Sequence, residues 1–270
     1  MSRRSFVIAT FGLSFAATAT ATAAAAAATA AVTASAGPVA AKVEDTMAQR
    51  VQACTGCHGP QGRAASDGYY PRIAGKPAGY LYNQLIAFRD GRRQYGLMNK
   101  LLAPLTDAYL REIAQHFAGL DLAYPKPQVA TAPVDALSRG EALVLHGDAA
   151  RGLPACVQCH GEALLGVAPA LPALIGLPRD YLNAQLGAWR TGNRQALAPD
   201  CMAQIAKALA PADIGALSQW LAAQPVPAGA KAATGQSEGA RGTSTALPVI
   251  RCGSVPAAGV APPANSGVAR

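Results

Sequence analysis

The sequence contains Cys54-Thr55-Gly56-Cys57-His58 and, later, Cys156-Val157-Gln158-Cys159-His160. Cys-x-x-Cys-His is the sequence to which c-type haem is attached. The two thiols of each motif bond to the vinyl groups of the porphyrin, and the adjacent histidine binds the iron. The sequence therefore predicts two covalently attached haem c groups, with His58 and His160 as iron ligands.

The alternatives for such cysteine pairs are a zinc site and a redox-active dithiol. Zinc motifs usually place the second pair about 15–20 residues after the first. Here the two pairs begin 102 positions apart. Neither alternative explains a histidine directly after both pairs, so covalent haem is the better interpretation.

Length and charge suggest two modest domains and a charged docking surface. The chain has 270 residues, a formal net charge of +8 and only 6% aromatic residues. A core with so few large side chains is thin, and a buried haem would fill much of it. Basic residues outnumber acidic ones over residues 37–130, which favours an acidic protein partner or a membrane surface. No nucleic-acid-binding motif accompanies the charge, so a nucleic-acid partner is not expected.

Residues 1–36 resemble a cleaved signal peptide. Arg3 and Arg4 precede an apolar stretch over residues 6–17, and small residues follow. Ala34-Ser35-Ala36 and Ala17-Thr18-Ala19 are both candidate cleavage sites. The prediction is a periplasmic protein, with an uncleaved membrane anchor as the alternative.

The remaining pattern indicates an all-α protein. A short helix is expected over residues 43–54, a second from Pro77 to Gly91 and a third from Thr106 to Gly119, each with apolar residues at helical spacing. Another helix is expected near 138–145, and no run resembles a strand.

The second half of the chain repeats the first, which indicates an internal duplication. The repeat predicts a first haem domain at 37–123, a Pro-rich linker at 124–134, a second haem domain at 135–224 and a flexible tail at 225–270. Corresponding residues are about 101–104 positions apart, for example Phe88/Trp189, Arg89/Arg190, Gly91/Gly192, Arg93/Arg194, Met98/Met202 and Ile113/Leu217.

Two methionines are the candidate sixth iron ligands. Met98 and Met202 follow their haem histidines by 40 and 42 residues, between the amphipathic helix and the last helix of each half. A lone methionine is usually core packing, but equivalent placement in both halves favours ligation, and thioether ligands raise the reduction potential. His116 and His146 are the weaker candidates.

These features resemble the dihaem class I cytochromes of the cytochrome c₄ family. The resemblance covers roughly residues 43–224. It implies two small all-helical haem domains that face each other, electron transfer in the periplasm, and partners that include terminal oxidases. The matching residues include Cys-x-x-Cys-His-Gly through Gly59 and Gly161, Pro71-Arg72-Ile73-Ala74-Gly75, Tyr80-Leu81, Gln84-Leu85, Phe88 to Arg93, Met98, Tyr181-Leu182, Gln185-Leu186, Arg190, Gly192, Met202 and Leu217.

The expected function is electron transfer without a substrate, so no catalytic residue is assigned. Partners would be a terminal oxidase, a membrane quinol-oxidising complex or a dehydrogenase. A haem subunit bound permanently to a periplasmic dehydrogenase is the alternative, and a dihaem redox enzyme is a weaker one, because two methionine ligands leave no open iron position. Arg89, Arg92 and Arg93 are candidates for docking a partner or pairing with haem propionates.

Three features depart from the family pattern: a longer segment over residues 193–201, Cys201 directly before Met202, and a long tail with Cys252. Four of the six cysteines would carry haem. In an oxidising compartment the remaining two, Cys201 and Cys252, predict a disulfide, with free thiols or an intermolecular bridge as alternatives. The disulfide would hold residues 247–255 next to Met202.

Overall fold

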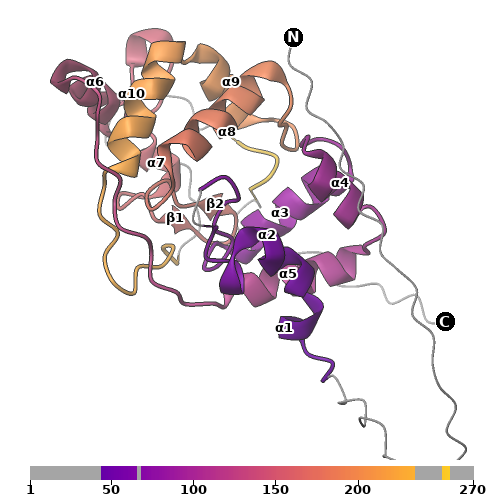
Figure 1. Cartoon of the computed structure of the whole chain (residues 1–270). Coiled ribbons are helices and arrows are strands. Elements are labelled where there is room, and N and C mark those ends of the chain that lie inside the picture. Colours follow the sequence, from indigo (N-terminus) through magenta and orange to yellow (C-terminus); the bar gives the residue numbers. More distant parts are fainter. Residues whose placement is uncertain (1–43, 66–67, 235–250, 256–270) are drawn as a thin grey trace, which may run out of the picture. The chain divides into compact units, whose positions relative to one another are not determined.

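The computed structural model describes residues 44–65, 68–234 and 251–255, and within them it is mostly helical, as predicted (Figure 1). The proposed signal peptide lies outside the described residues. We call residues 44–123 the first half and residues 135–224 the second half. The helices of the first half are α1 (Met47–Arg50), α2 (Gln52–His58), α3 (Ala78–Arg89), α4 (Gly96–Leu102) and α5 (Asp107–Ala118), with a 3₁₀ turn η1 (Pro60–Gly62).

The second half repeats this order. A short antiparallel hairpin, which the sequence did not predict, pairs β1 (Gly166–Val167) with β2 (Leu171–Pro172). Strands of two residues are too short to show an alternating pattern. The helices of the second half are α6 (Val134–Leu145), α7 (Val157–His160), α8 (Arg179–Thr191), α9 (Cys201–Ala208) and α10 (Pro211–Ala222), with a 3₁₀ turn η2 (Ala149–Arg151).

Local capping explains where the longer helices begin and end. The Thr106 hydroxyl accepts a hydrogen bond from the Tyr109 N–H and so caps α5. Helix α3 follows Pro77 and stops before Gly91, whose φ of 76° belongs to the left-handed region that glycine adopts readily. The helix expected over residues 43–54 is instead two helices, α1 and α2, separated at Val51.

Each half has its own hydrophobic cluster. In the first half α3 packs on α5, and Leu110 and Phe117 are at most 2% exposed. In the second half α10 packs on both α6 and α8, and Val144 and Leu221 are similarly buried. The two clusters share no residue.

Four polar side chains join the halves, and we call them the clasp: Gln84, Arg93, Gln185 and Arg194. Arg93 donates to the Oε1 atoms of Gln84 (2.9 Å) and Gln185 (2.5 Å). Arg194 donates to the Oε1 atoms of the same two glutamines, at 2.8 Å to Gln185 and 2.9 Å to Gln84. Each arginine therefore binds one glutamine of its own half and one of the other half.

Backbone hydrogen bonds and ring contacts extend this symmetry. The Gln94 N–H donates to the Asn193 carbonyl (2.7 Å), and the Gln195 N–H donates to the Arg92 carbonyl (2.8 Å). The two clasp arginines stack on corresponding aromatic rings, Arg93 over Phe88 at 4.4 Å and Arg194 over Trp189 at 3.7 Å. Duplicated residues thus meet each other at the boundary.

This arrangement changes the interpretation of the arginines of the first half. Arg93 contributes to the contact between the halves through Gln84 and Gln185. Arg92 pairs with Asp90 (3.3 Å), and Arg89 pairs with Asp90 and Asp107. All three therefore have partners within the described chain.

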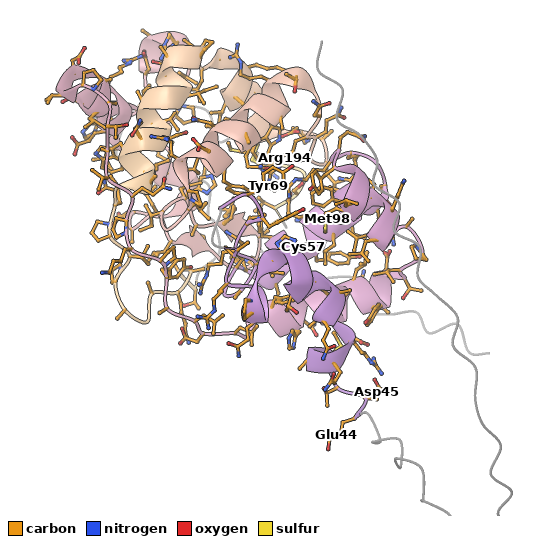
Figure 2. The ribbon with its side chains drawn as sticks, in the orientation of Figure 1. Glu44, Asp45, Cys57, Tyr69, Met98 and Arg194 are labelled. Atoms are coloured by element: carbon orange, nitrogen blue, oxygen red, sulfur yellow. A yellow bond between two sulfur atoms is a disulfide. The ribbon has the colours of Figure 1, made fainter. Side chains whose placement is uncertain are left out.

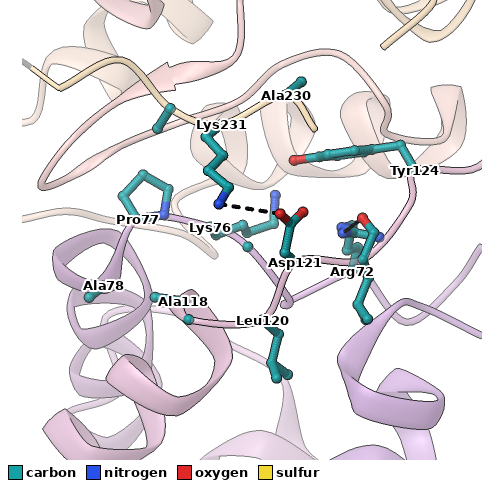
Figure 3. A pocket seen from close by; sticks show the side chains of 14 residues that line it. Arg72, Lys76, Pro77, Ala78, Ala118, Leu120, Asp121, Tyr124, Ala230 and Lys231 are labelled. Carbon is teal, nitrogen blue, oxygen red and sulfur yellow. Dashed lines mark hydrogen bonds and ion pairs between the residues drawn. The ribbon is translucent and has the colours of Figure 1, made fainter. Parts of the chain in front are cut away.

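Residues 225–234, expected to begin a flexible tail, fold back onto the chain. The Ala233 N–H donates to the Gly166 carbonyl, and the Ala233 carbonyl accepts from the Ala168 N–H, both at 2.9 Å. Lys231 forms an exposed ion pair with Asp121 (3.2 Å) beside a cavity of about 320 Å³ (Figure 3). In the described part of the chain, no helix is long and apolar enough to cross a membrane.

We predict that Gly140→Ala destabilises the second half. A Cβ on Gly140 of α6 would lie 2.4 Å from the Ala216 carbonyl oxygen of α10, and such overpacking costs about 1–3 kcal/mol. The matched control is Gly215→Ala on α10, where a Cβ meets nothing within 4 Å and the loss of glycine flexibility stabilises a helix by roughly 0.5–1 kcal/mol. Denaturant unfolding followed by circular dichroism measures both, and equal stabilities would contradict the close helix contact.

Candidate functional site

The first Cys-x-x-Cys-His motif lies on α2, which presents Cys54, Cys57 and His58. His58 is 8% exposed, and its Nδ1 lies 2.8 Å from the Pro71 carbonyl oxygen. A carbonyl only accepts, so Nδ1 carries the proton and Nε2 keeps its lone pair. Burial lowers the pKa of His58, which favours the neutral ring that a metal requires.

The histidine of the second motif has the same hydrogen-bond geometry, although the two residues between the cysteines differ. His160 ends α7, is 6% exposed, and has its Nδ1 2.8 Å from the Pro172 carbonyl oxygen. Burial again lowers the pKa of the histidine. A backbone carbonyl that fixes the tautomer and orientation of a histidine is a regular feature of metal ligation.

The cysteines do not have the character of a redox dithiol. Burial raises the pKa values of Cys54 and Cys159, and it raises the pKa of Cys156 to about 11. Redox-active pairs have lowered pKa values instead. Among the residues that the structure describes, no group of three or more His, Cys, Asp or Glu side chains is arranged to hold a metal ion.

A cavity of about 780 Å³ lies against the first motif, within the size range of cofactor sites. Cys54, Cys57 and His58 line it, and so does Met98 of α4. Figure 2 shows Cys57, Met98 and Arg194 in this region of the molecule. The structure thus brings together the four predicted haem-binding residues of the first half. Leu97 (61% exposed) and Leu101 (42% exposed) flank Met98 and form an apolar, solvent-exposed rim.

Met202 occupies the corresponding position of the second half, on α9. It packs, with Cys156 and Val157 of the second haem motif, against the hydrophobic cluster of the second half. Both methionines lie in short helices, α4 and α9, which the sequence analysis did not predict. His116 contacts the Phe117 ring and His146 caps α6; neither lines the cavity.

Buried positive charge without acidic partners surrounds the large cavity. Arg194 (4% exposed) and Lys76 (6% exposed) both line it, and within the described chain neither forms an ion pair. Burial opposes ionisation of the Tyr80 phenol, but the charges of Arg194, Arg93 and Lys76 outweigh this and lower its pKa to about 8. Buried charges are normally paired, so the cavity is built for an anionic group.

An unpaired donor in the second half points to the same kind of ligand. Trp189 Nε1 is buried without a hydrogen-bond partner. Buried donors are nearly always satisfied, and a haem carries two propionates that accept hydrogen bonds. The thiols, imidazoles, thioethers and unpaired donors together fit two haem groups.

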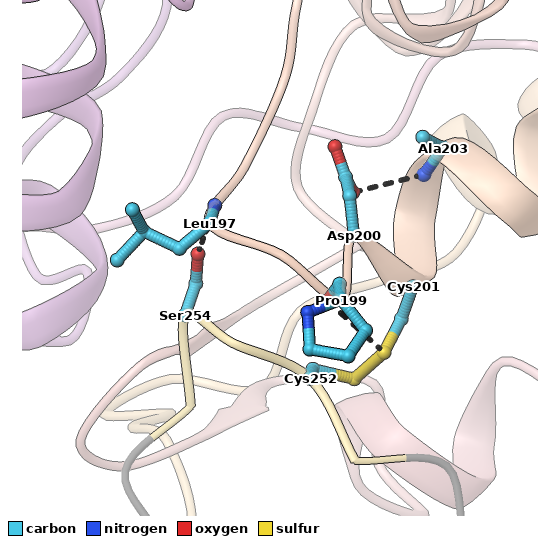
Figure 4. Close-up of a disulfide and its surroundings, with 7 residues drawn as sticks. All are labelled: Leu197, Pro199, Asp200, Cys201, Ala203, Cys252 and Ser254. Carbon is cyan, nitrogen blue, oxygen red and sulfur yellow. Dashed lines mark hydrogen bonds between the residues drawn. A yellow bond between two sulfur atoms is a disulfide. The ribbon is translucent and has the colours of Figure 1, made fainter.

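The structure also contains the Cys201–Cys252 disulfide that the cysteine count predicts (Figure 4). The S–S distance is 1.98 Å and the Cα–Cα distance is 5.5 Å. Asp200 caps the N-terminus of α9 beside it through the Ala203 N–H. Of the tail segment expected near Met202, residues 247–250 lie outside the described residues.

The chain is similar in sequence to known cytochromes, although no family model matches it. A protein of Thiomonas intermedia named thiosulfate dehydrogenase electron acceptor is 38% identical over 176 residues, which are 64% of this chain and 79% of that protein. Cytochrome c₄ of Pseudomonas aeruginosa is 35% identical over 170 residues, 62% of this chain and 82% of that one.

Solved structures show the same relationship. Reduced cytochrome c₄ from Pseudomonas stutzeri matches with a TM-score of 0.57 and 29% identity, over 65% of this chain and 95% of that chain. A thiosulfate dehydrogenase from Marichromatium purpuratum matches with a TM-score of 0.55 and 34% identity, over 64% of this chain but only 36% of that longer chain. The chain belongs to the cytochrome c₄ family of electron-transfer proteins and carries two covalent haem c groups.

Proposed function

We propose that this dihaem cytochrome is the periplasmic electron acceptor of a dehydrogenase that oxidises thiosulfate or a similar small anion. The observation that carries the proposal is the 38% identity to a thiosulfate dehydrogenase electron acceptor over most of that protein's length. A dehydrogenase that releases two electrons suits an acceptor with two one-electron sites. The Cys201–Cys252 disulfide supports an oxidising compartment.

We assign His58 with Met98, and His160 with Met202, as the two axial ligand pairs. When bound, each haem supplies a one-electron iron couple, and a thioether ligand favours the reduced state. The chain's part is to keep each imidazole neutral by burial, to fix its tautomer through a proline carbonyl, and to attach the ring through Cys54 and Cys57 or Cys156 and Cys159. The two haem domains of this proposal are residues 37–123 and 135–224.

The cations that line the cavity have a second role in the proposal. Arg194 and Lys76 are buried and Arg93 is half-buried, and their positive charge disfavours the more positive ferric iron. They would also bind the propionates that the site requires. The clasp therefore acts on the reduction potential as well as on the contact between the halves.

We predict that Met98→Ala and Met202→Ala each remove one methionine-to-iron band from the ferric absorption spectrum. Loss of the thioether leaves that iron high-spin or bound by a replacement ligand. Met47→Ala, on α1, is the control and should leave the spectrum unchanged. A ligand variant with an unaltered ferric spectrum would reject that methionine.

We predict that Arg194→Met lowers a haem midpoint potential by an amount equivalent to on the order of 1 kcal/mol, since it removes a buried unit charge. Lys126→Met makes the same change of charge at an exposed residue and is the control. A spectroscopic redox titration measures both variants. Equal potentials in the Arg194→Met variant and the native protein would show that the clasp has no electrostatic role.

The exposed rim around Met98 is the proposed docking point. We predict that Leu97→Glu slows reduction by a thiosulfate dehydrogenase about tenfold or more, because the few central residues that dominate an interface each cost about 2 kcal/mol or more when changed. The control is Val129→Glu on the linker, 85% exposed and outside the cavity lining. Stopped-flow reduction with thiosulfate as the substrate measures the rates, and equal rates for both variants would place docking elsewhere.

A permanent dehydrogenase subunit is the second candidate function. The match to a much longer thiosulfate dehydrogenase chain supports it, because there the matched region is part of one polypeptide. Size-exclusion chromatography of the native periplasmic fraction separates the two candidates. A free carrier elutes at or below the 27.4 kDa of the full chain, whereas a subunit co-elutes with dehydrogenase activity.

A further inference from the structure

A short piece of the tail is anchored on the second half, and we call residues 252–255 the strap. The Cys201–Cys252 disulfide holds it covalently. The Gly253 N–H donates to the Pro199 carbonyl (3.0 Å), and the Leu197 N–H donates to the Ser254 hydroxyl (3.1 Å; Figure 4). A Cβ on Gly253 would lie 2.2 Å from the Ala198 carbonyl oxygen, so the two backbones are in direct contact.

The same strap also reaches the first half. The Asn83 side chain on α3 donates through Nδ2 to the Ser254 carbonyl oxygen at 2.8 Å. Asn83 adjoins Gln84 of the clasp. Ser254 of the strap thus contacts α3, and Cys252 of the strap is bonded to Cys201 at the start of α9.

We propose that the strap is a positioning element that fixes how the two haem domains face each other. The other contacts named between the halves, which include the clasp and the hydrogen bond from the Tyr80 N–H to the Pro169 carbonyl oxygen (3.2 Å), are non-covalent. The strap adds a contact that the disulfide holds covalently on the second half. Because the strap cannot leave the second half, its hydrogen bond to Asn83 resists rotation of one half against the other.

The route of the chain supports this role. The segment over residues 193–201 begins at the clasp, next to Arg194, and ends at the disulfide. Leu197 and Pro199, the residues that seat the strap, lie within it. The segment over residues 193–201 and Cys252 therefore act together. They extend the contact between the halves from the clasp to Asn83.

The strap acts on the contact between the two halves of this chain, so its role does not depend on the proposed dehydrogenase partner. Three variants of the full haem-loaded protein test this role. Cys201→Ser with Cys252→Ser frees the strap from the second half. Asn83→Leu keeps the branched shape of the side chain and adds no charge, but removes the first half's hydrogen-bond donor to the strap. Arg251→Lys is the control, because Arg251 is exposed, lies directly before the strap and keeps its charge in this variant, while the disulfide and the strap's hydrogen bonds stay.

Hydrogen–deuterium exchange of the segments that contain the Gln94 and Gln195 amides reports the contact directly. We expect exchange about fivefold to tenfold faster in the cysteine variant and in Asn83→Leu, as for loss of one ordinary hydrogen bond. The control should stay near the native rate. Redox titration gives a second readout: the separation of the two midpoint potentials should change in the first two variants only.

Two results would overturn the proposal. Native exchange rates in both test variants would show that the other contacts between the halves fix their relative orientation without the strap. Faster exchange in the cysteine variant but native exchange and potentials in Asn83→Leu would show that the strap stabilises only the second half.

Discussion

A histidine binds haem iron only if one ring nitrogen keeps its lone pair, and in both halves a proline carbonyl fixes Nε2 as that nitrogen. The carbonyl oxygens of Pro71 and Pro172 accept hydrogen bonds from the Nδ1–H groups of His58 and His160, both at 2.8 Å. The helices that carry the motifs end at once, because Gly59 and Gly161 adopt φ values of 76° and 83°. The chain then turns back to deliver the proline carbonyl. Thus the motif, the glycine after it and the proline loop form one unit.

Duplication of that unit explains why the boundary between the halves is polar. When two copies of one surface meet, each residue faces its own counterpart or a neighbour of it. Two arginines would repel across such a boundary, but here each is shared between two glutamine oxygens and stacked on a ring. The positive charge remains uncompensated by acids within the described chain. In the proposed function, haem propionates would supply the missing anions, and cofactor binding and domain contact would then depend on each other.

Local signals predicted the parts of the fold that local chemistry determines. The haem motifs, the α3 and α5 boundaries near Pro77, Gly91, Thr106 and Gly119, and the two spare cysteines are all visible in the sequence. Helices α4 and α9 were not predicted, because seven or eight residues hardly establish a period. The clasp was missed for a different reason: Arg93 and Gln185 become neighbours only through tertiary structure. Its one available signal was the shared offset of 101 residues between the pairs Gln84/Gln185 and Arg93/Arg194.

The two halves differ in the surroundings of their corresponding methionines. In the first half Met98 stands between two exposed leucines, whereas in the second half Met202 follows a buried, disulfide-bonded Cys201. A haem next to an accessible rim would be more hydrated than one beside a covalently held segment, and hydration favours the more highly charged ferric state. The two proposed haem sites therefore differ in their surroundings, although their predicted ligand types match. Duplication supplies two matching haem-attachment motifs, and the strap and the rim give them different environments.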